Sequence, residues 1–439
     1  MMLAGSTGLK DLADELLTVP KSFGANAGLK VLALVAGMVA GADSIDDMAI
    51  LRHGGMKKLF TGTYAPSTLG SFLRAITFGH VRQLDATARR WLNNLAAVAP
   101  IVAGIDDYAL VDIDDTIKEV HGYQKQGAGF GYSHVRGLNA LIGIVSTATA
   151  APIIVGSRLR RGPTNSVRGR GREVRLRHPR DSEPVAVDDR DRTRAPARRQ
   201  RLLRPLGCGR RTSRRGEGVH HRADGFCGQT HPPPSPIPRG PRSSTPPRSS
   251  TKAQGSGSRS RKSLRSPSPR SCPRRKKKAD RIHGRLIVRR IRELNAFAGD
   301  GQPTLFDTHR FHAFFTTSDL DPVTADKTHR QHAVIEQINA DLKDSALGHF
   351  PSGVFSANAA WLVLATITFN LSRAIGTLTG TDLGKARTAT IRRKLIQIPA
   401  RISTTARKVV LHLPKHWPWE TGWTSLHAAT CSPPRTASP

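Results

Sequence analysis

Apolar residues in the first hundred positions recur at the spacing of helices. Leu29 to Ala42 is an apolar run, and Pro66 opens a segment that predicts a helix over residues 69–78. An amphipathic pattern follows over residues 83–97. We therefore predict a helical region over residues 1–104.

After residue 104 the apolar positions alternate with polar ones, which is the pattern of a strand. In the segment 109–116 this alternation places Asp112 and Asp114 on the same side of the strand. Residues 138–146 and 152–157 predict two more strands joined by a short turn. Residues 105–160 therefore predict the opening of a mixed α/β sheet.

A second ordered region is predicted over residues 281–385. Strands are expected over 284–291 and 311–317, and helices over 325–342 and 357–378. Apolar residues at helical spacing form a buried stripe on the first of these helices: Val334, Ile335, Ile338 and Leu342.

The C-terminal segment, residues 386–439, predicts a hairpin and a tryptophan-rich tail. Residues 394–398 and 408–413 have the composition of two short strands that could pair. Three tryptophans then follow within seven residues, Trp417, Trp419 and Trp423. So close a group is more typical of packing than of ligand binding.

Residues 161–278 break both patterns. They contain 33 Lys and Arg, 8 Asp and Glu, 16 of the 29 prolines and one aromatic residue, Phe226. Leu, Ile, Val, Phe and Met make up only 12 of these 118 residues, well below the roughly 20% at which a segment can bury enough apolar surface to fold. We expect a disordered Arg-, Pro-, Ser- and Gly-rich segment over residues 161–280.

Charge is concentrated in the same segment. The chain has a formal net charge of +35, of which +25 falls in residues 161–278 and +10 elsewhere. A basic balance suits a polyanionic partner such as nucleic acid, although a soluble basic surface also explains it. The N-terminal helices carry Arg74, His80 and Arg82. They are therefore a candidate DNA-reading module, and a plain helical bundle is an equally good interpretation.

The cysteines and the apolar runs exclude some classes of protein. None of the four cysteines forms a Cys-x-x-Cys pair, so we expect neither a disulfide framework nor a zinc site. The N-terminus lacks the pattern of a signal peptide. The apolar runs 29–42 and 359–369 are shorter than the roughly 20 residues that cross a bilayer. We therefore expect buried helices and a cytoplasmic protein with no membrane partner.

Two distant segments carry carboxylates that suit divalent metals. Asp114, near the end of a strand, and Glu336, on a helix, could supply oxygen ligands to magnesium. Asp114 could equally cap a turn, and Glu336 could lie on a solvated helix face. His329 and His332 precede Glu336 by seven and four residues, and Lys343 follows it by seven. In one continuous helix all four side chains would share a face.

These segments resemble those of a known family. Asp114-Asp115-Thr116, followed by His121-Gly122-Tyr123-Gln124, resembles the first-aspartate segment of bacterial insertion-sequence transposases of the DDE class. The later signature of that family is Tyr, two residues, Arg, three residues, Glu, six residues, Lys. In this chain those positions hold His329, His332, Glu336 and Lys343, so the Glu and the Lys match and the two histidines depart. Residues 27–157 and 285–423 together resemble an actinobacterial-type member.

The resemblance implies a fold, a reaction and a partner. The fold is a ribonuclease-H-like mixed sheet with flanking helices. The reaction is metal-dependent cleavage and strand transfer at the ends of an insertion sequence, with Mg²⁺ or Mn²⁺. The partner is double-stranded DNA, as terminal inverted repeats and as target, handled in the nucleoid by a homodimer in an intact relative.

The same resemblance implies roles for individual residues. Asp114 and Glu336 would be catalytic metal ligands, and Asp112 would be an auxiliary acid. Lys343 would contact a phosphate. His329 and His332 would lie at the outer DNA-contacting positions, where both depart from the residues of the signature.

The family's second catalytic aspartate has no clear counterpart. It lies on a core strand, in a segment resembling Leu-Arg-Ala-Asp-Ser, which would fall within residues 161–278. Arg222-Ala223-Asp224 is similar in letters, but no apolar strand leads into it, so this ligand stays unassigned. The composition of the segment is that of a GC-rich gene read out of frame. We hypothesise a frameshift entered near residue 161 and left near residue 275.

The sequence therefore predicts a degenerate, inactive copy of a cut-and-paste DDE transposase. Two other classes remain open. One is a non-enzymatic nucleic-acid-binding protein whose arginine-rich segment gives salt-sensitive affinity. The other is a nuclease with the same core that makes no strand-transfer products.

Overall fold

The structure is a computed structural model. It describes residues 1–60, 63–107, 109–131, 133–164, 220–222, 284–292, 309–405 and 408–431. The described residues form helices and small antiparallel sheets, in agreement with the predicted α/β class. Contacts divide the chain into a first unit, residues 1–168 with 333–439, and a second unit, residues 169–332. The predictions made for residues 161–278, Asp224 among them, lie outside the described residues except at 161–164 and 220–222.

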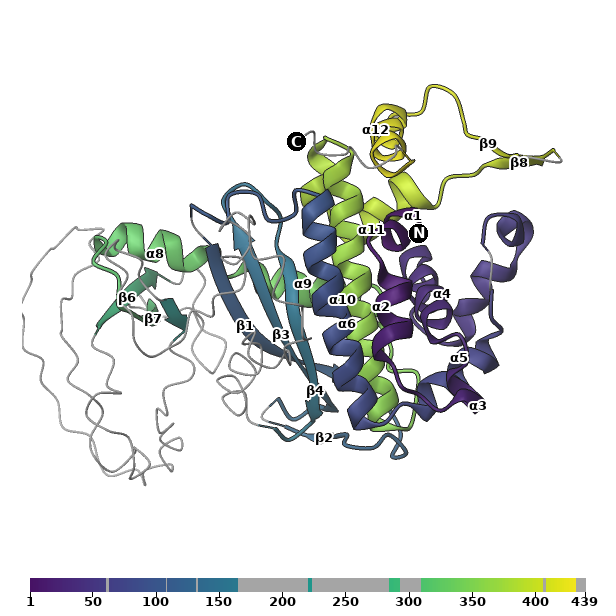
Figure 1. Cartoon of the computed structure of the whole chain (residues 1–439). Coiled ribbons are helices and arrows are strands. Elements are labelled where there is room, and N and C mark those ends of the chain that lie inside the picture. Colours follow the sequence, from purple (N-terminus) through teal and green to yellow (C-terminus); the bar gives the residue numbers. More distant parts are fainter. Residues whose placement is uncertain are drawn as a thin grey trace, which may run out of the picture. The chain divides into compact units, whose positions relative to one another are not determined.

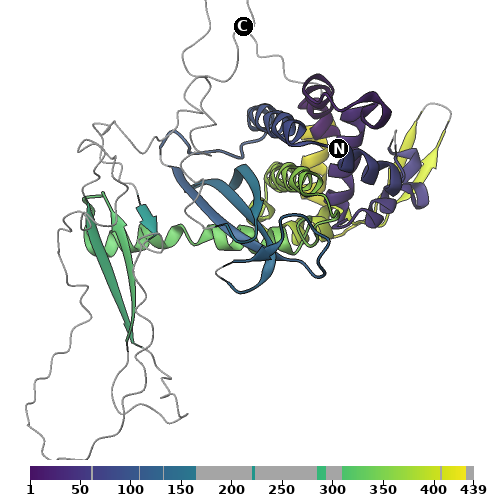
Figure 2. The ribbon, with the colours of Figure 1, turned by 90° about the horizontal axis from the view of Figure 1, so that it is seen from below.

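The helix α10 (Phe355–Leu378) is the centre of the first unit. Almost all of its side chains are buried, because it packs against the sheet on one side and against other helices on the rest of its surface. Figures 1 and 2 show α10 beside the long helix α6 (Phe78–Val98), with α4 (Ala27–Ala40) and α5 (Pro66–Ala75) on the side away from the sheet. A helix that is apolar all round is stable only when it is enclosed in this way.

Shorter helices complete the N-terminal part of this unit. The predicted helices over 69–78 and 83–97 correspond to α5 and α6, and the run 29–42 corresponds to α4. The remaining elements are α1 (Met2–Ser6), α2 (Leu9–Leu16), α3 (Lys21–Gly24), η1 (Asp46–Arg52) and η2 (Gly54–Lys58). One hydrophobic cluster joins α1, α2, α4, α5, α6 and η1 to the sheet and to α10.

The sheet of the first unit is an antiparallel meander. The strand β1 (Ala109–Glu119) pairs along its whole length with β3 (Arg136–Thr147), and β4 (Ile153–Arg161) pairs with the other edge of β3. The two-residue strand β2 (Gly129–Phe130) extends one end. The register sets Asp114 opposite Ile142 and Asp112 opposite Ile144, and both isoleucines are fully buried. The face that carries Asp112 and Asp114 is therefore the face turned to the core.

Hydrogen bonds from α10 hold this sheet. The Asn370 side chain accepts from the Ile154 backbone nitrogen at 2.9 Å and donates to the Ile154 carbonyl at 2.7 Å. The Thr366 hydroxyl donates to the Ser157 hydroxyl at 3.0 Å. Each pair joins residues more than two hundred positions apart in the sequence. Such bonds fix the register between helix and strand as well as their distance.

The single helix predicted over 325–342 is wrong, because the structure has two helices there. α8 (Pro322–Gln331) begins after Asp321, whose side chain accepts from the Val323 and Thr324 backbone nitrogens. α9 (Val334–Lys343) follows after a turn. At the break, His332 N donates to His329 O and Glu336 N donates to Ala333 O. Both bonds span three residues instead of the four of an α-helix, so the regular ladder is interrupted.

The second unit contains a small sheet and α8. The strands predicted over 284–291 and 311–317 are β6 (Arg285–Arg292) and β7 (His309–Thr316), which pair antiparallel. The three-residue strand β5 (His220–Arg222) pairs with the other edge of β7. The core of this unit, within the described residues, is formed by Ile287, Phe314 and Ala325.

The C-terminal segment departs from the prediction in one strand. Residues 392–396, which overlap the predicted strand 394–398, form the π-helix η8 (Arg392–Ile396) directly after α11 (Thr388–Ile391). Ile391 and Leu395 lie one helical turn apart and are both buried, so packing favours the helix. The hairpin lies further on, in β8 (Arg401–Thr404) and β9 (Val409–His412), and projects from the helices in Figure 1. η7 (Asp382–Lys385) precedes α11, and α12 (Glu420–Cys431) closes the described chain.

The two apolar runs lie in buried helices, as predicted. α10 is longer than its apolar run, however, and its length and composition would suffice to cross a membrane. All of its apolar window is buried inside the first unit. The structure therefore gives α10 the place of a core helix.

Candidate active site

The aspartates of β1 divide between the two faces of the sheet. Asp112 and Asp114 lie on the core side, opposite buried isoleucines of β3. Asp112 is buried and Asp114 is half-buried. Asp115 points to the other face, as strand alternation requires. The aspartates predicted to act together therefore lie on one face, because the strand is regular at this point.

α9 packs against β1 and brings Glu336 to the same strand. The Asn339 side-chain nitrogen lies 3.4 Å from Asp114 Oδ2, which is a long hydrogen bond. Glu336 lies one helical turn before Asn339 and is exposed. Two of the predicted metal ligands, from segments more than two hundred residues apart, thus lie on adjoining elements.

Lys343 lies at the other end of the same helix face. It is half-buried, and burial lowers its pKa from the ordinary lysine value, with the nearby positive charge of Lys118 lowering the pKa further. Asn339 and Lys343, both on α9, thus interact with residues of β1, Asp114 and Lys118 respectively.

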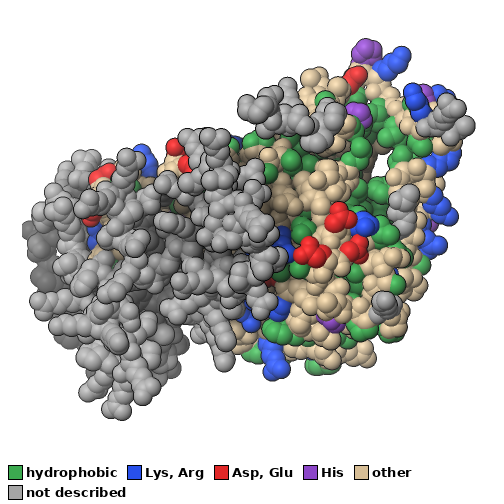
Figure 3. Space-filling view, in the orientation of Figure 1, with side chains coloured by type: hydrophobic (Ala, Val, Ile, Leu, Met, Phe, Trp, Pro, Cys, Tyr) green, Lys and Arg blue, Asp and Glu red, His purple; other side chains and the backbone are tan. Residues whose placement is uncertain are grey.

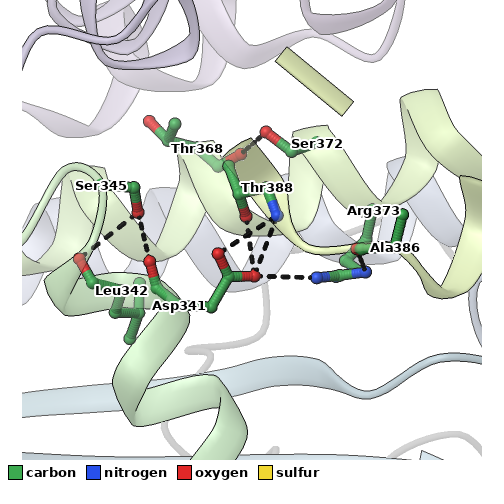
Figure 4. A network of polar contacts seen from close by, with 8 residues as sticks. All are labelled: Asp341, Leu342, Ser345, Thr368, Ser372, Arg373, Ala386 and Thr388. Atoms are coloured by element: carbon green, nitrogen blue, oxygen red, sulfur yellow. Dashed lines mark hydrogen bonds and ion pairs between the residues drawn. The ribbon is translucent and has the colours of Figure 1, made fainter. Parts of the chain in front are cut away.

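A buried network fixes α9 in place (Figure 4). Asp341 accepts hydrogen bonds from the Thr388 backbone nitrogen at 3.0 and 3.1 Å and from the Thr388 hydroxyl at 3.0 Å. It also forms an ion pair with Arg373 of α10, with an N–O distance of 3.0 Å. Only 4% of each of these two side chains is exposed. The network joins α9, α10 and α11, so it holds the helix that carries Glu336.

A second buried ion pair fixes the opposite face of β1. Asp115 Oδ2 lies 2.9 Å from an Arg160 nitrogen, and the Asn139 side chain donates to the same carboxylate. Arg160 Nε in turn donates to Asn139 Oδ1 at 2.8 Å. These three residues come from β1, β3 and β4, so they tie the strands together across the sheet. Their role is structural, and it was not assigned from the sequence.

The two predicted histidines lie in the second unit. His329 of α8 stacks on Phe314 of β7, with ring centroids 4.0 Å apart and planes at 4°. His332 follows the end of α8, and its ring centroid is 5.7 Å from that of His329. The helix break separates both from Glu336 and Lys343. The prediction that His329, His332, Glu336 and Lys343 share one helix face is therefore wrong for the two histidines. Glu336 and Lys343 do share a face, because both lie on α9.

The helical side of the first unit is not uniformly basic. A group of acidic side chains gathers over α2 in Figure 3. α2 carries Asp11 and Asp14, which pair with Lys10, and Glu15, which pairs with Arg90 of α6 at 3.1 Å. Acidic groups at this position argue against the α2 surface as a contact for phosphates.

The residues around Asp114 fit a divalent cation in part. Carboxylate and amide oxygens are the ligands that magnesium and manganese take. Asn339 is 8% exposed, and its Oδ1 has no hydrogen-bond partner within the described residues. In the same part of the chain, no three His, Cys, Asp or Glu side chains lie close enough to hold a metal ion. The donors present are hard oxygens, but the carboxylate set is incomplete.

Comparison with known proteins places the C-terminal part in a family. Residues 310–430 match the family model described as Transposase DDE domain group 1. This segment is therefore similar to the DDE domain of a transposase. No curated protein and no solved structure matched.

The DDE domain match spans β7 to α12 and includes Glu336, Lys343 and the Asp341 network. It does not include β1, so the aspartates of that strand are connected to the family through the packing of α9 on β1. A transposase acts on DNA, so the similarity implies a DNA substrate. Transposase domains of the DDE class usually use a divalent metal ion. Sequence reasoning did not identify Asn339, Asp341 or Asp115 as functional or supporting residues, because each acts through a partner that is distant in the sequence.

Proposed function

We propose that the chain descends from a transposase that cuts and joins DNA at the ends of an insertion sequence, and that this copy lacks that activity. The observation that carries the proposal is the packing of α9 on β1. It sets a helix that belongs to the DDE domain, with Glu336, beside the strand that carries Asp112 and Asp114. The antiparallel meander with helices on its core face is in keeping with a ribonuclease-H-like core.

In this proposal each residue has a definite task. Asp114 and Glu336 bind divalent metal, and Asp112, buried two residues before Asp114, supports them. Lys343 contacts a DNA phosphate, and Lys118 of β1 adds a positive charge that acts on it. When bound, the metal would activate the attacking oxygen and stabilise the leaving oxygen of the phosphodiester.

The proposed loss of activity rests on the missing second aspartate. Residues 161–278 are poor in apolar residues, and Asp224 lies there without an apolar strand before it. A two-metal site that lacks one carboxylate holds its ions weakly and positions them poorly. Sequencing the gene tests the frameshift hypothesis directly. A single intact frame with no compensating insertions or deletions would remove it.

The decisive assay is nicking of a labelled duplex that carries the inverted repeats flanking the gene, with Mg²⁺ or Mn²⁺. We expect binding without cleavage, and no change on Glu336→Ala. Cleavage that Glu336→Ala abolishes would show that the copy is active, and that a residue outside the assigned set completes the site. A chain that neither binds this duplex nor cuts it would contradict the transposase lineage.

A non-enzymatic nucleic-acid-binding protein is the second candidate. The charge of +35 favours it, because phosphate binding needs only distributed positive charge. Equal affinity for repeat-bearing and unrelated duplexes of the same length would favour this candidate over a protein that retains recognition of its element ends.

A further inference from the structure

Asn339 of α9 contacts Asp114, and its side-chain amide is only partly satisfied there. Its nitrogen donates to Asp114 over 3.4 Å, beyond the usual 2.9–3.0 Å of such a bond. Its oxygen is buried and has no hydrogen-bond partner among the described residues. A buried amide that lacks one partner and holds the other loosely costs free energy. Such a group in a folded core needs a reason.

We propose that Asn339 is a metal ligand, whose side-chain oxygen binds a divalent cation together with Asp114. The inference rests on the proposed function, since it concerns the cation of that same site. It adds a residue type that neither the motif spacing nor a search for carboxylates and histidines would find. It also gives the site a third oxygen donor besides Asp114 and Glu336.

The distances suit this role. The oxygen and the nitrogen of an asparagine exchange places when the amide turns by half a rotation, and they are assigned from their surroundings. After such a turn, the oxygen would stand where the nitrogen is now, 3.4 Å from Asp114 Oδ2. Neighbouring ligands of one octahedral magnesium or manganese ion lie roughly 3 Å apart, since each bond is about 2.1 Å. A small shift would therefore let both oxygens bind one ion.

The orientation of the Asn339 amide should depend on whether a cation is bound at Asp114. Without a cation, the carboxylate of Asp114 favours the amide nitrogen. A divalent ion at Asp114 reverses this preference, because the ion attracts the oxygen and repels the nitrogen. The helix itself need not move, since the Asp341 network holds the following turn of α9.

The test is Mn²⁺ binding to the full-length chain, followed by the electron paramagnetic resonance signal of free Mn²⁺. The Mn²⁺ binding assigned to this site is the part that is lost in the Asp114→Ala variant. We expect Asn339→Ala to weaken that binding by about tenfold or more, since even loss of a residue that only supports a ligand costs about 10–100-fold. Asn339→Asp should bind Mn²⁺ more tightly than the natural chain, because it replaces a neutral oxygen with a charged one.

Asn358 provides a matched control. It is also a buried asparagine, but both ends of its amide are satisfied by the Ser352 backbone, at 2.7 and 3.0 Å. Asn358→Ala should lower the melting temperature and leave Mn²⁺ affinity unchanged. Asn339→Asp should also melt lower than the natural chain without metal, because two carboxylates then adjoin, and Mn²⁺ should restore its melting temperature.

A second measurement covers the event that Asn339→Ala does not fold. Fe²⁺ bound to the natural chain, with ascorbate and peroxide, should cleave the backbone near residues 112–116 and near residues 336–339. Cleavage at both places supports a cation between β1 and α9. Cleavage near 112–116 alone would overturn the inference.

The outcomes separate the inference from the proposed function. If Asn339→Ala behaves like Asn358→Ala, lowering stability with unchanged Mn²⁺ affinity, then Asn339 is a structural residue and only the inference fails. If Asp114→Ala leaves Mn²⁺ binding unchanged, this chain has no cation site at Asp114 and the inference also fails. The transposase lineage is judged independently, by binding of the terminal-repeat duplex in the absence of metal.

Discussion

Asp341 shows how one residue can support a site that it does not touch. Asp341→Ala would leave the guanidinium of Arg373 buried without its carboxylate, and the Thr388 backbone nitrogen without its acceptor. Breaking a buried ion pair at one partner costs about 3–5 kcal/mol. We expect a loss of this size in the free energy of unfolding, measured by urea denaturation. Asp11→Ala, which removes an exposed partner of Lys10, should leave the midpoint unchanged. Equal midpoints for both variants would contradict the proposed support of α9.

Lys343 should lose its proton at lower pH than Lys10. Burial and the charge of Lys118 lower the pKa of Lys343, whereas the hydrogen bond and the charge of Asp14 raise the pKa of Lys10. The folded chain thus binds the Lys343 proton less tightly than the unfolded chain does. Its contribution to stability should therefore rise with pH, from the lowered pKa up to the ordinary value of 10.5.

Carbon-13 NMR titration of the lysine side chains measures this order, with Lys343→Arg to assign the signal. Lys118→Met should raise the pKa of Lys343 by removing the like charge. If Lys343 titrates together with Lys10 or after it, α9 does not hold Lys343 against β1 as described.

Among the elements, β1 offers a direct test of strand alternation. Asp115 belongs to a buried pair with Arg160, and the exposed fractions of the two side chains are 9% and 7%. Asp114, on the other face, is half-buried and accepts a long hydrogen bond from Asn339. Asp115→Ala should therefore lower the free energy of unfolding by about 3 kcal/mol or more. Asp114→Ala should cost less than Asp115→Ala, because Asp114 is only half-buried. Thermal melts of the two variants side by side would show the reverse order if the register of β1 were shifted by one residue.

Most elements of the first unit could be predicted from the period of hydrophobic residues in the sequence, and the exceptions have physical causes. The alternation around Asp112 and Asp114 predicted β1 because apolar and polar residues alternate along the strand. The helix predicted over 325–342 divides at His332, where the apolar stripe continues but the hydrogen-bond ladder does not. Periodicity detects the buried side of a helix, and it does not detect a change in the span of its hydrogen bonds.

The candidate site was predictable only where local spacing marks it. Asp114 and Glu336 stand in recognisable segments, and the structure brings their elements together. Asn339 and Asp341 are ordinary helix residues in the sequence. Their importance comes from Asp114 and Arg373, which lie on other elements. Long-range pairs of this kind cannot be read from one sequence, because nothing in the local pattern names the partner.

At the scale of the molecule, the N-terminal helices share one core with the sheet, α9 and α10. α6, α4 and α5 cover the surface of α10 that the sheet leaves free, and one hydrophobic cluster includes all of them. A chain that begins at residue 105 would expose to water the apolar side chains of α10 that α4, α5 and α6 cover. We expect it to aggregate or to lack a cooperative melt, judged by size-exclusion chromatography and circular dichroism. A folded, soluble truncated chain would show instead that residues 1–104 are an independent module.

DNA binding should outlast catalysis in this chain, because the two depend on different properties. Binding rests on a net charge of +35 that is distributed along the sequence. Catalysis rests on a few ligands that must converge, and residues 161–278 provide no recognisable second aspartate. We expect duplex DNA affinity to fall steeply with salt, on a straight line of log affinity against log salt. Chelation of metal by EDTA and Glu336→Ala should leave that line unchanged.

Variants of Lys118 and Lys343 test whether DNA binds next to β1 and α9. If both contact phosphates next to the carboxylates, the double variant Lys118→Met, Lys343→Met should release about two fewer counterions, so the slope should fall by roughly 0.9 for each lysine. The matched control changes Lys327 and Lys385, two exposed lysines on α8 and η7, which lie outside the β1–α9 contact. Both double variants lose the same formal charge, so a purely distributed attraction would change both slopes equally. A larger change at Lys118 and Lys343 would mean that DNA contacts the chain beside the carboxylates of β1 and α9.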